Sequence, residues 1–107
     1  MRDALAAFAA MACVLALHAA QGFPTLTDFG GDNDSLLRLV EVRDLLAGQG
    51  WFDLHQYRMG PEGSFVMHWS RLVDAPIAAL MLLGGESFAL VAWPALLFAA
   101  ALWLVLR

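Results

Sequence analysis

Lysine is absent from this chain of 107 residues, so every basic side chain apart from the histidines is an arginine. We attribute this to a genomic composition bias; selection for fixed-charge contacts to anions is the alternative. The single cysteine, Cys13, excludes a disulfide framework within the chain and a cysteine-based zinc site. There are no internal repeats, and low complexity is confined to the alanine-rich ends. The distribution of charge and of hydrophobic residues is therefore the main source of information.

The net charge of −4 lies entirely in residues 21–74, where the acidic side chains outnumber the arginines. At the two ends the charges cancel, since Arg2 offsets Asp3 and Glu86 offsets Arg107. A nucleic-acid partner requires a basic surface to neutralise its phosphates. The acidic middle segment therefore excludes nucleic acid as the expected partner.

Hydrophobic residues make up 61% of the chain and gather at its ends, which predicts contact with lipid rather than a small soluble core. Residues 1–20 are assigned to the first transmembrane helix; its hydrophobic run, residues 4–20, would be about 26 Å long as a helix, near the short limit for a bilayer core. A cleaved signal peptide is the alternative, but the neutral start and the lack of a small-x-small site favour an uncleaved span. Residues 86–106 form a second, full-length span, in which Pro94 is expected to introduce a kink.

The polar segment 21–74 is expected to be a loop that carries one surface helix over residues 35–47. Asp34 or Ser35 can cap its first turn, and Gly48 and Gly50 end it. Its apolar residues recur with the period of an α-helix, which predicts a helix with one apolar side and one solvated side. The apolar side is formed by Leu36, Leu39, Val40 and Leu46, and the solvated side by Glu41 and Asp44.

The remaining segments are less regular. Residues 51–71 have no sustained period and are rich in aromatic side chains, which suits the headgroup level of a membrane. Residues 75–84 are predicted to form a short apolar helix, too short to cross and broken at Gly84 and Gly85. The predicted fold is thus an all-α membrane protein, with two transmembrane helices that flank a loop and with both termini on one side.

Two clusters of residues are candidates for catalysis or ligand binding. In Asp32-Asn33-Asp34, the two carboxylates can share a divalent cation such as Mg²⁺ or Mn²⁺, or one of them can act as a base. The alternative is that they only form a turn and cap a helix. In the second cluster, Arg71 can contact a phosphate and His68 can move protons. The alternative there is an interfacial anchor formed by Trp69 and Arg71.

In their order along the chain, these motifs resemble the start of the GT-C class of integral-membrane glycosyltransferases. Asp32 is followed by Arg38 at the spacing of the oligosaccharyltransferase pattern, and then by Trp51-Phe52-Asp53. The stretch around Pro76 and the Gly84-Gly85-Glu86 turn resemble the approach to the second span in protein O-mannosyltransferases.

The resemblance implies sugar transfer from a polyprenyl-phosphate donor at the extracytoplasmic face of the membrane, with the bacterial inner membrane as the expected location. It implies catalytic roles for Asp32 and Asp34, with donor contacts from Arg38, Arg71 and His68. Members of the class have many more spans, so we expect a fragment, a truncated gene or a small relative that has lost catalysis, which needs the remaining spans of a longer enzyme or partner membrane proteins. The alternative is a non-catalytic two-span protein that packs against larger membrane partners through its small residues.

Overall fold

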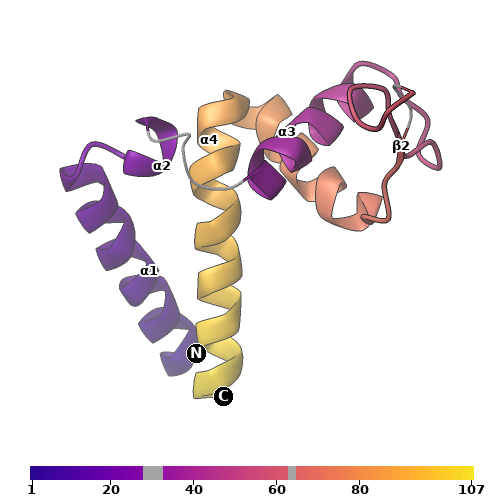
Figure 1. Cartoon of the computed structure of the whole chain (residues 1–107). Coiled ribbons are helices and arrows are strands. Elements are labelled where there is room, and N and C mark those ends of the chain that lie inside the picture. The colour runs from indigo at the N-terminus through magenta and orange to yellow at the C-terminus, as the bar shows by residue number, and fades with distance from the viewer. Residues whose placement is uncertain (28–32, 63–64) are drawn as a thin grey trace.

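The computed structural model describes residues 1–27, 33–62 and 65–107, and most of this part of the chain is helical (Figure 1). The elements in chain order are α1 (Arg2–Ala20), α2 (Pro24–Thr27), α3 (Asn33–Leu46), β1 (His55–Gln56), β2 (Phe65–Val66) and α4 (Arg71–Leu106). The expectation of a mainly helical chain is confirmed.

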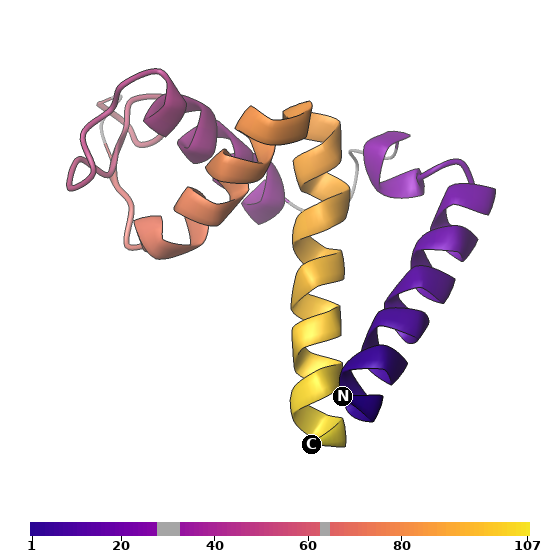
Figure 2. The same ribbon diagram turned by 180° about the vertical axis from the view of Figure 1, so that it is seen from behind.

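Helices α1 and α4 are both long and apolar enough to cross a membrane, by length and composition. Their large hydrophobic side chains are mostly exposed. α1 and the second half of α4 run in opposite directions, and both termini lie at the same end of the molecule (Figures 1 and 2). The helices meet at that end and diverge toward α2, leaving an apolar cleft of about 200 Å³.

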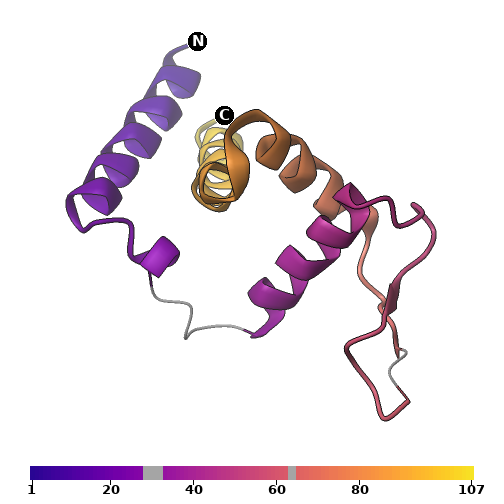
Figure 3. The ribbon, with the colours of Figure 1, turned by 90° about the horizontal axis from the view of Figure 1, so that it is seen from above.

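The 36-residue helix α4 is bent at one residue, Gly85, whose dihedral angles are φ 83° and ψ 178°. Only glycine adopts this backbone region readily. Viewed from above, the second half of α4 is seen end-on and its first half lies across it (Figure 3). From the side, this first half lies in the same layer as α3, at the end away from the termini (Figure 1). The chain therefore has two upright helices and, at one end, a layer that lies across them.

The break in α4 falls at the predicted glycines, but the helix begins at Arg71 rather than at residue 75. The reason is a cap: the Ser70 hydroxyl accepts a hydrogen bond from the backbone N–H of Leu72 at 3.2 Å. Around Pro94 the dihedral angles of α4 are helical, since Gly85 alone departs from them within this helix. The change in direction of α4 is thus attributable to Gly85.

Helix α3 packs against α4, and Val42 is central to the small core between them. The core residues are Val42, Ile77, Ala78 and Ala89, flanked by Leu45, Leu80, Met81 and Trp93. The buried face of α3 agrees with the predicted apolar side at Leu39, which is buried, but not at Leu36 and Leu46, which are 40% and 39% exposed. Val42, which was not assigned to that side, is buried. Periodicity identified the helix, but which side faces inward depends on where α4 lies.

Residues 51–70 contain one short strand pair that the sequence did not predict. β1 and β2 are antiparallel, with His55 opposite Val66 and Gln56 opposite Phe65. Strands of two residues each are too short to show the alternation of apolar and polar residues by which a strand is predicted. The pair holds the two arms of the loop together beside α3 (Figure 1).

A bidentate ion pair connects α3 to the bend of α4. The Arg43 Nε and Nη2 atoms donate to the two Glu86 carboxylate oxygens at 2.9 and 2.6 Å. Both side chains are partly exposed, so we expect a coupling free energy of about 0.5–1 kcal/mol. A double-mutant cycle of Arg43→Met and Glu86→Gln, followed by unfolding in detergent at two salt concentrations, should show this coupling and its decrease with salt. Additive single-variant effects would contradict it.

Candidate functional site

The main candidate site is a pocket of about 390 Å³ in the bend of α4, which also contacts the start of α3. Its polar end consists of side chains from α3, and its apolar wall comes from both halves of α4. The lining residues are Asp34, Ser35, Arg38, Trp69, Val73, Ile77, Ala89, Leu90, Trp93 and Pro94. Polar and apolar surfaces thus meet in one cavity, at the start of the upright half of α4.

Arg38 supplies the positive charge of this pocket. Its Nη1 atom donates to Asp74 Oδ1 at 2.8 Å, and its guanidinium lies 4.2 Å from the centre of the Trp69 ring. The side chain keeps 22% of its surface exposed. The ion pair and the aromatic ring fix the direction of the guanidinium and leave part of it accessible from the pocket.

Arg71, a predicted phosphate contact, is 3% exposed and binds other parts of the chain. Its Nη1 donates to the Glu41 backbone carbonyl at 3.0 Å and to Asp74 at 3.3 Å. Its Nη2 donates to Gln49 Oε1 and to the Asp53 carbonyl, both at 2.7 Å. An anion would have to displace these acceptors, so the geometry assigns Arg71 to holding α3, the loop and α4 together.

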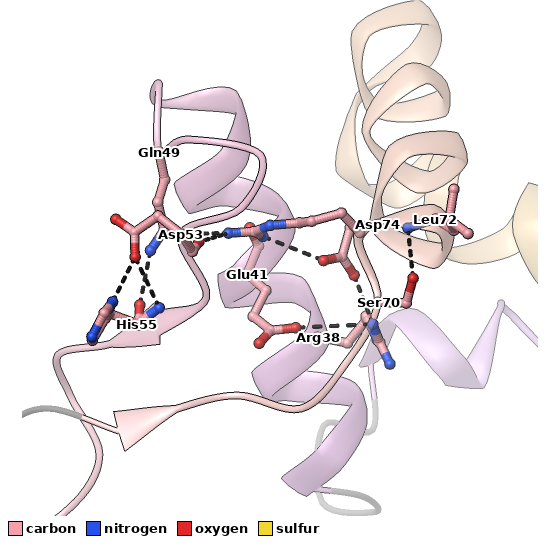
Figure 4. Close-up of polar contacts among 9 residues, drawn as sticks. Arg38, Glu41, Gln49, Asp53, His55, Ser70, Leu72 and Asp74 are labelled. Carbon is pink, nitrogen blue, oxygen red and sulfur yellow. Dashed lines mark hydrogen bonds and ion pairs between the residues drawn. The ribbon is translucent and has the colours of Figure 1, made fainter.

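Two carboxyl groups, those of Glu41 and Asp74, are buried beside these arginines, and Figure 4 shows both of them with Arg38. Asp74 is 0% exposed and accepts from both Arg38 and Arg71. Glu41 is also 0% exposed, so its prediction as a solvated residue of the helix is wrong. Sequence periodicity missed it because the groups around Glu41 include Arg71 and Asp74, which lie about thirty residues further along the chain.

Glu41 has an unusual environment for a carboxyl group. Among the described residues, none donates a hydrogen bond to either of its oxygens, and Arg38 Nη1 lies 3.9 Å from Oε2. Burial, followed by the charge of Asp74, raises its pKa above the ordinary range of glutamate, and Asp44 adds to this. The charges of Arg38 and Arg71 act in the opposite direction but do not cancel the shift.

The other predicted site residues lie around the pocket or outside the described chain. Asp34 lines the pocket from the first turn of α3. Asp32 lies outside the described residues. In the part of the chain that is described, no three His, Cys, Asp or Glu side chains are grouped as a metal site would require. The shared Mg²⁺ or Mn²⁺ between Asp32 and Asp34 therefore stays a prediction.

His68 is exposed and does not line the pocket. Its ring contacts Trp69 edge to face, with the centroids 6.3 Å apart. His68 thus contacts the same tryptophan as Arg38, and its predicted contact with the donor stays a prediction.

A second polar arrangement, on the loop, was missed by the sequence reasoning. Asp53 Oδ1 lies 2.7 Å from His55 Nδ1 and accepts the His55 backbone N–H at 3.1 Å, and the imidazole stacks on Tyr57. The hydrogen bonds from the His55 side chain and then its backbone lower the pKa of Asp53. The Asp-x-His spacing was the available signal. These residues do not line the pocket beside Arg38.

Comparison of the chain with protein-family models, curated proteins and solved structures gives no match. The functional argument consequently depends on the order of the motifs and on the pocket itself.

Proposed function

We propose that this chain is the amino-terminal membrane portion of a glycosyltransferase, which takes a sugar from a polyprenyl-phosphate donor at the extracytoplasmic face of a bacterial inner membrane. One observation carries the proposal: the pocket that joins the Arg38 guanidinium to an apolar wall on α4. A polyprenyl-phosphate sugar has the same combination, a phosphodiester attached to a hydrocarbon chain.

The pocket is suited to this donor at both of its ends. Arg38 offers guanidinium N–H groups that match phosphate oxygens. Beyond it, Ile77 and Trp93 provide apolar surface for the first isoprene units, where each buried methylene contributes about 0.8 kcal/mol. The upright half of α4 continues from this wall, so the rest of the hydrocarbon chain can lie along the helix in lipid.

The resemblance assigns the chemistry to Asp32 and Asp34. Asp32 removes the proton from an acceptor hydroxyl, whose oxygen then forms a bond to the anomeric carbon of the sugar. The bond from that carbon to the phosphate oxygen breaks, and the lipid phosphate leaves with the electron pair. Arg38 stabilises the negative charge that develops on it. Asp34, from its position on the pocket, orients the acceptor or completes a cation site with Asp32.

Further helices are needed to enclose this site, since the pocket described here is one wall of it. The divergence of α1 from α4 exposes the apolar cleft between them, which includes Met11, Leu15 and Phe98. In the proposal, the remaining spans of a longer enzyme or of partner membrane proteins cover these faces.

The proposal is tested by donor binding. The chain is placed in nanodiscs of zwitterionic lipid and titrated with farnesyl methyl phosphate, a phosphodiester with one fixed charge. Arg38→Met should weaken binding about 10- to 100-fold, as expected for loss of a charge-assisted hydrogen bond. Arg38→Lys keeps the charge but not the planar guanidinium, so its affinity should lie between that of the unmodified chain and that of Arg38→Met.

Arg58→Met is the matched control, because Arg58 is an exposed loop arginine that does not line this pocket. It should bind the phosphodiester as the unmodified chain does. Equal affinities for the Arg38→Met and Arg58→Met variants would sink the assignment of the pocket as the donor site.

A further inference from the structure

Four charged side chains form a cluster between α3 and the first half of α4: Arg38, Glu41, Arg71 and Asp74. Glu41, Arg71 and Asp74 are 0–3% exposed, whereas Arg38 is 22% exposed and lines the pocket. The cluster therefore has one accessible member. A change of charge on one of the three buried side chains therefore affects the pocket through Arg38.

Asp74 and Glu41 are unequal partners for the arginines. Asp74 accepts N–H groups at 2.8 Å from Arg38 and at 3.3 Å from Arg71. Glu41 is 3.9 Å from the same Arg38 atom and accepts no hydrogen bond from the described residues. A buried carboxylate without hydrogen bonds is costly, and the usual relief is to keep its proton.

We propose that Glu41 is a proton-dependent control on anion binding in the pocket, acting through Arg38. When Glu41 is protonated, two guanidinium groups face one carboxylate, and the excess positive charge is accessible at Arg38. When Glu41 is ionised, the cluster is neutral and a second carboxylate competes for the Arg38 guanidinium. This inference concerns the regulation of the donor site and rests on the proposed function.

The direction of the pH dependence follows from the charges that face Glu41. From α4 these are Asp74 and Arg71, and from α3 they are Arg38 and Asp44. The loop contributes Asp53, but its carboxylate is turned to His55 and only its backbone carbonyl reaches Arg71. Because burial raises the pKa of Glu41, its proton is released at a higher pH than that of an exposed glutamate. Anion affinity should fall as the pH rises through that value.

The experiment measures the affinity for farnesyl methyl phosphate in nanodiscs between about pH 4.5 and 8.5. A phosphodiester keeps one charge over this range, so any pH dependence arises in the protein. For the unmodified chain we expect affinity to fall about tenfold across the titration, within the usual range of coupling between two sites. The Glu41→Gln variant should bind equally at all pH values, with the affinity of the unmodified chain at low pH.

Two further variants serve as controls. Asp44→Asn removes the neighbouring acid of α3 that is not in the cluster, and it should keep the pH dependence. Glu41→Asp keeps a titratable carboxyl, and it should keep a pH dependence even if Glu41→Gln folds poorly. Circular dichroism in nanodiscs shows which variants retain their helices.

The outcomes distinguish the proton-dependent control by Glu41, here called the switch, from the donor site itself. Loss of binding in Arg38→Met, together with a pH-independent affinity of the unmodified chain, would overturn the switch and leave the pocket as an anion site. A pH dependence that persists unchanged in Glu41→Gln would overturn the assignment to Glu41. Absence of binding by the unmodified chain at every pH would overturn both the switch and the proposed function.

Discussion

Replacement of Arg71 by methionine is expected to lower the free energy of unfolding by about 3–5 kcal/mol, the usual cost of breaking a buried ion pair by removing one partner. Arg71 is 3% exposed, and its two terminal nitrogens donate to four groups. These groups belong to three separate parts of the chain: α3, the loop and α4 itself. The Arg71 side chain therefore connects three segments of the described structure.

The expected effect is large because the substitution leaves the acceptors and the carboxyl groups around Arg71 without one of their partners. Methionine fills much of the volume but donates no hydrogen bond, so the Glu41 backbone carbonyl loses a partner at a buried position and the Asp53 carbonyl loses one at a partly buried position. Asp74 retains only Arg38, and Glu41 loses one of the two positive charges that favour its ionised form. The loop should detach from α3 before the upright helices separate.

The measurement is chemical unfolding in detergent micelles, with amide hydrogen exchange to locate the opening. Arg71→Lys should recover only part of the loss, since a single ammonium cannot reach acceptors on opposite sides of a guanidinium. The matched control is Arg58→Met, which removes an exposed arginine from the same loop. Stability of Arg71→Met equal to that of this control would show that Arg71 does not hold the loop.

The sequence predicted those features that depend on local pattern. Two long apolar runs predicted the two helices that can span a membrane, and Gly84-Gly85 predicted the break in α4. Each of these signals lies within one stretch of chain, so no knowledge of neighbours was needed. The start of α4 at Arg71 was missed because Ser70 was not identified as a cap.

The candidate site was only partly predictable. Asp34 and Arg38 were named from their spacing, and they do share a pocket. The role of Arg71 could not be inferred, because three of its four acceptors lie 18 to 30 residues earlier in the chain. Glu41 lay on the side expected to face solvent, and only the position of α4 shows that it is buried.

The bend of α4 leads to the second large effect, which is expected for Gly85→Val. With φ at 83° and ψ at 178°, Gly85 has a conformation that is almost exclusive to glycine. A Cβ atom there would meet no other atom within 4 Å, so the cost arises from the backbone and not from crowding. We expect a loss of about 3 kcal/mol, the upper end for a strained residue, because valine is β-branched.

The strain can be relieved if α4 straightens at this point, and the structure shows what that would disrupt. The first half of α4 carries Ile77 and Asp74, which hold α3 in place, and Glu86 binds Arg43 just past the bend. A straight α4 would move its two halves apart, and the pocket between them would open. Gly85→Val should therefore lose affinity for the phosphodiester together with stability.

Spin labels can detect this change directly. Leu36 and Phe98 are 40% and 42% exposed, so cysteines at these positions in a Cys13→Ala background can carry labels on α3 and on the upright half of α4. Gly85→Val should broaden the distance distribution between them or shift it to longer values. Ser87→Val is the control, since it adds the same side chain at an exposed position two residues away where α4 is helical. If the distance distribution and the stability of Gly85→Val match those of Ser87→Val, the bend does not depend on glycine, and the account of how α4 forms the pocket is wrong.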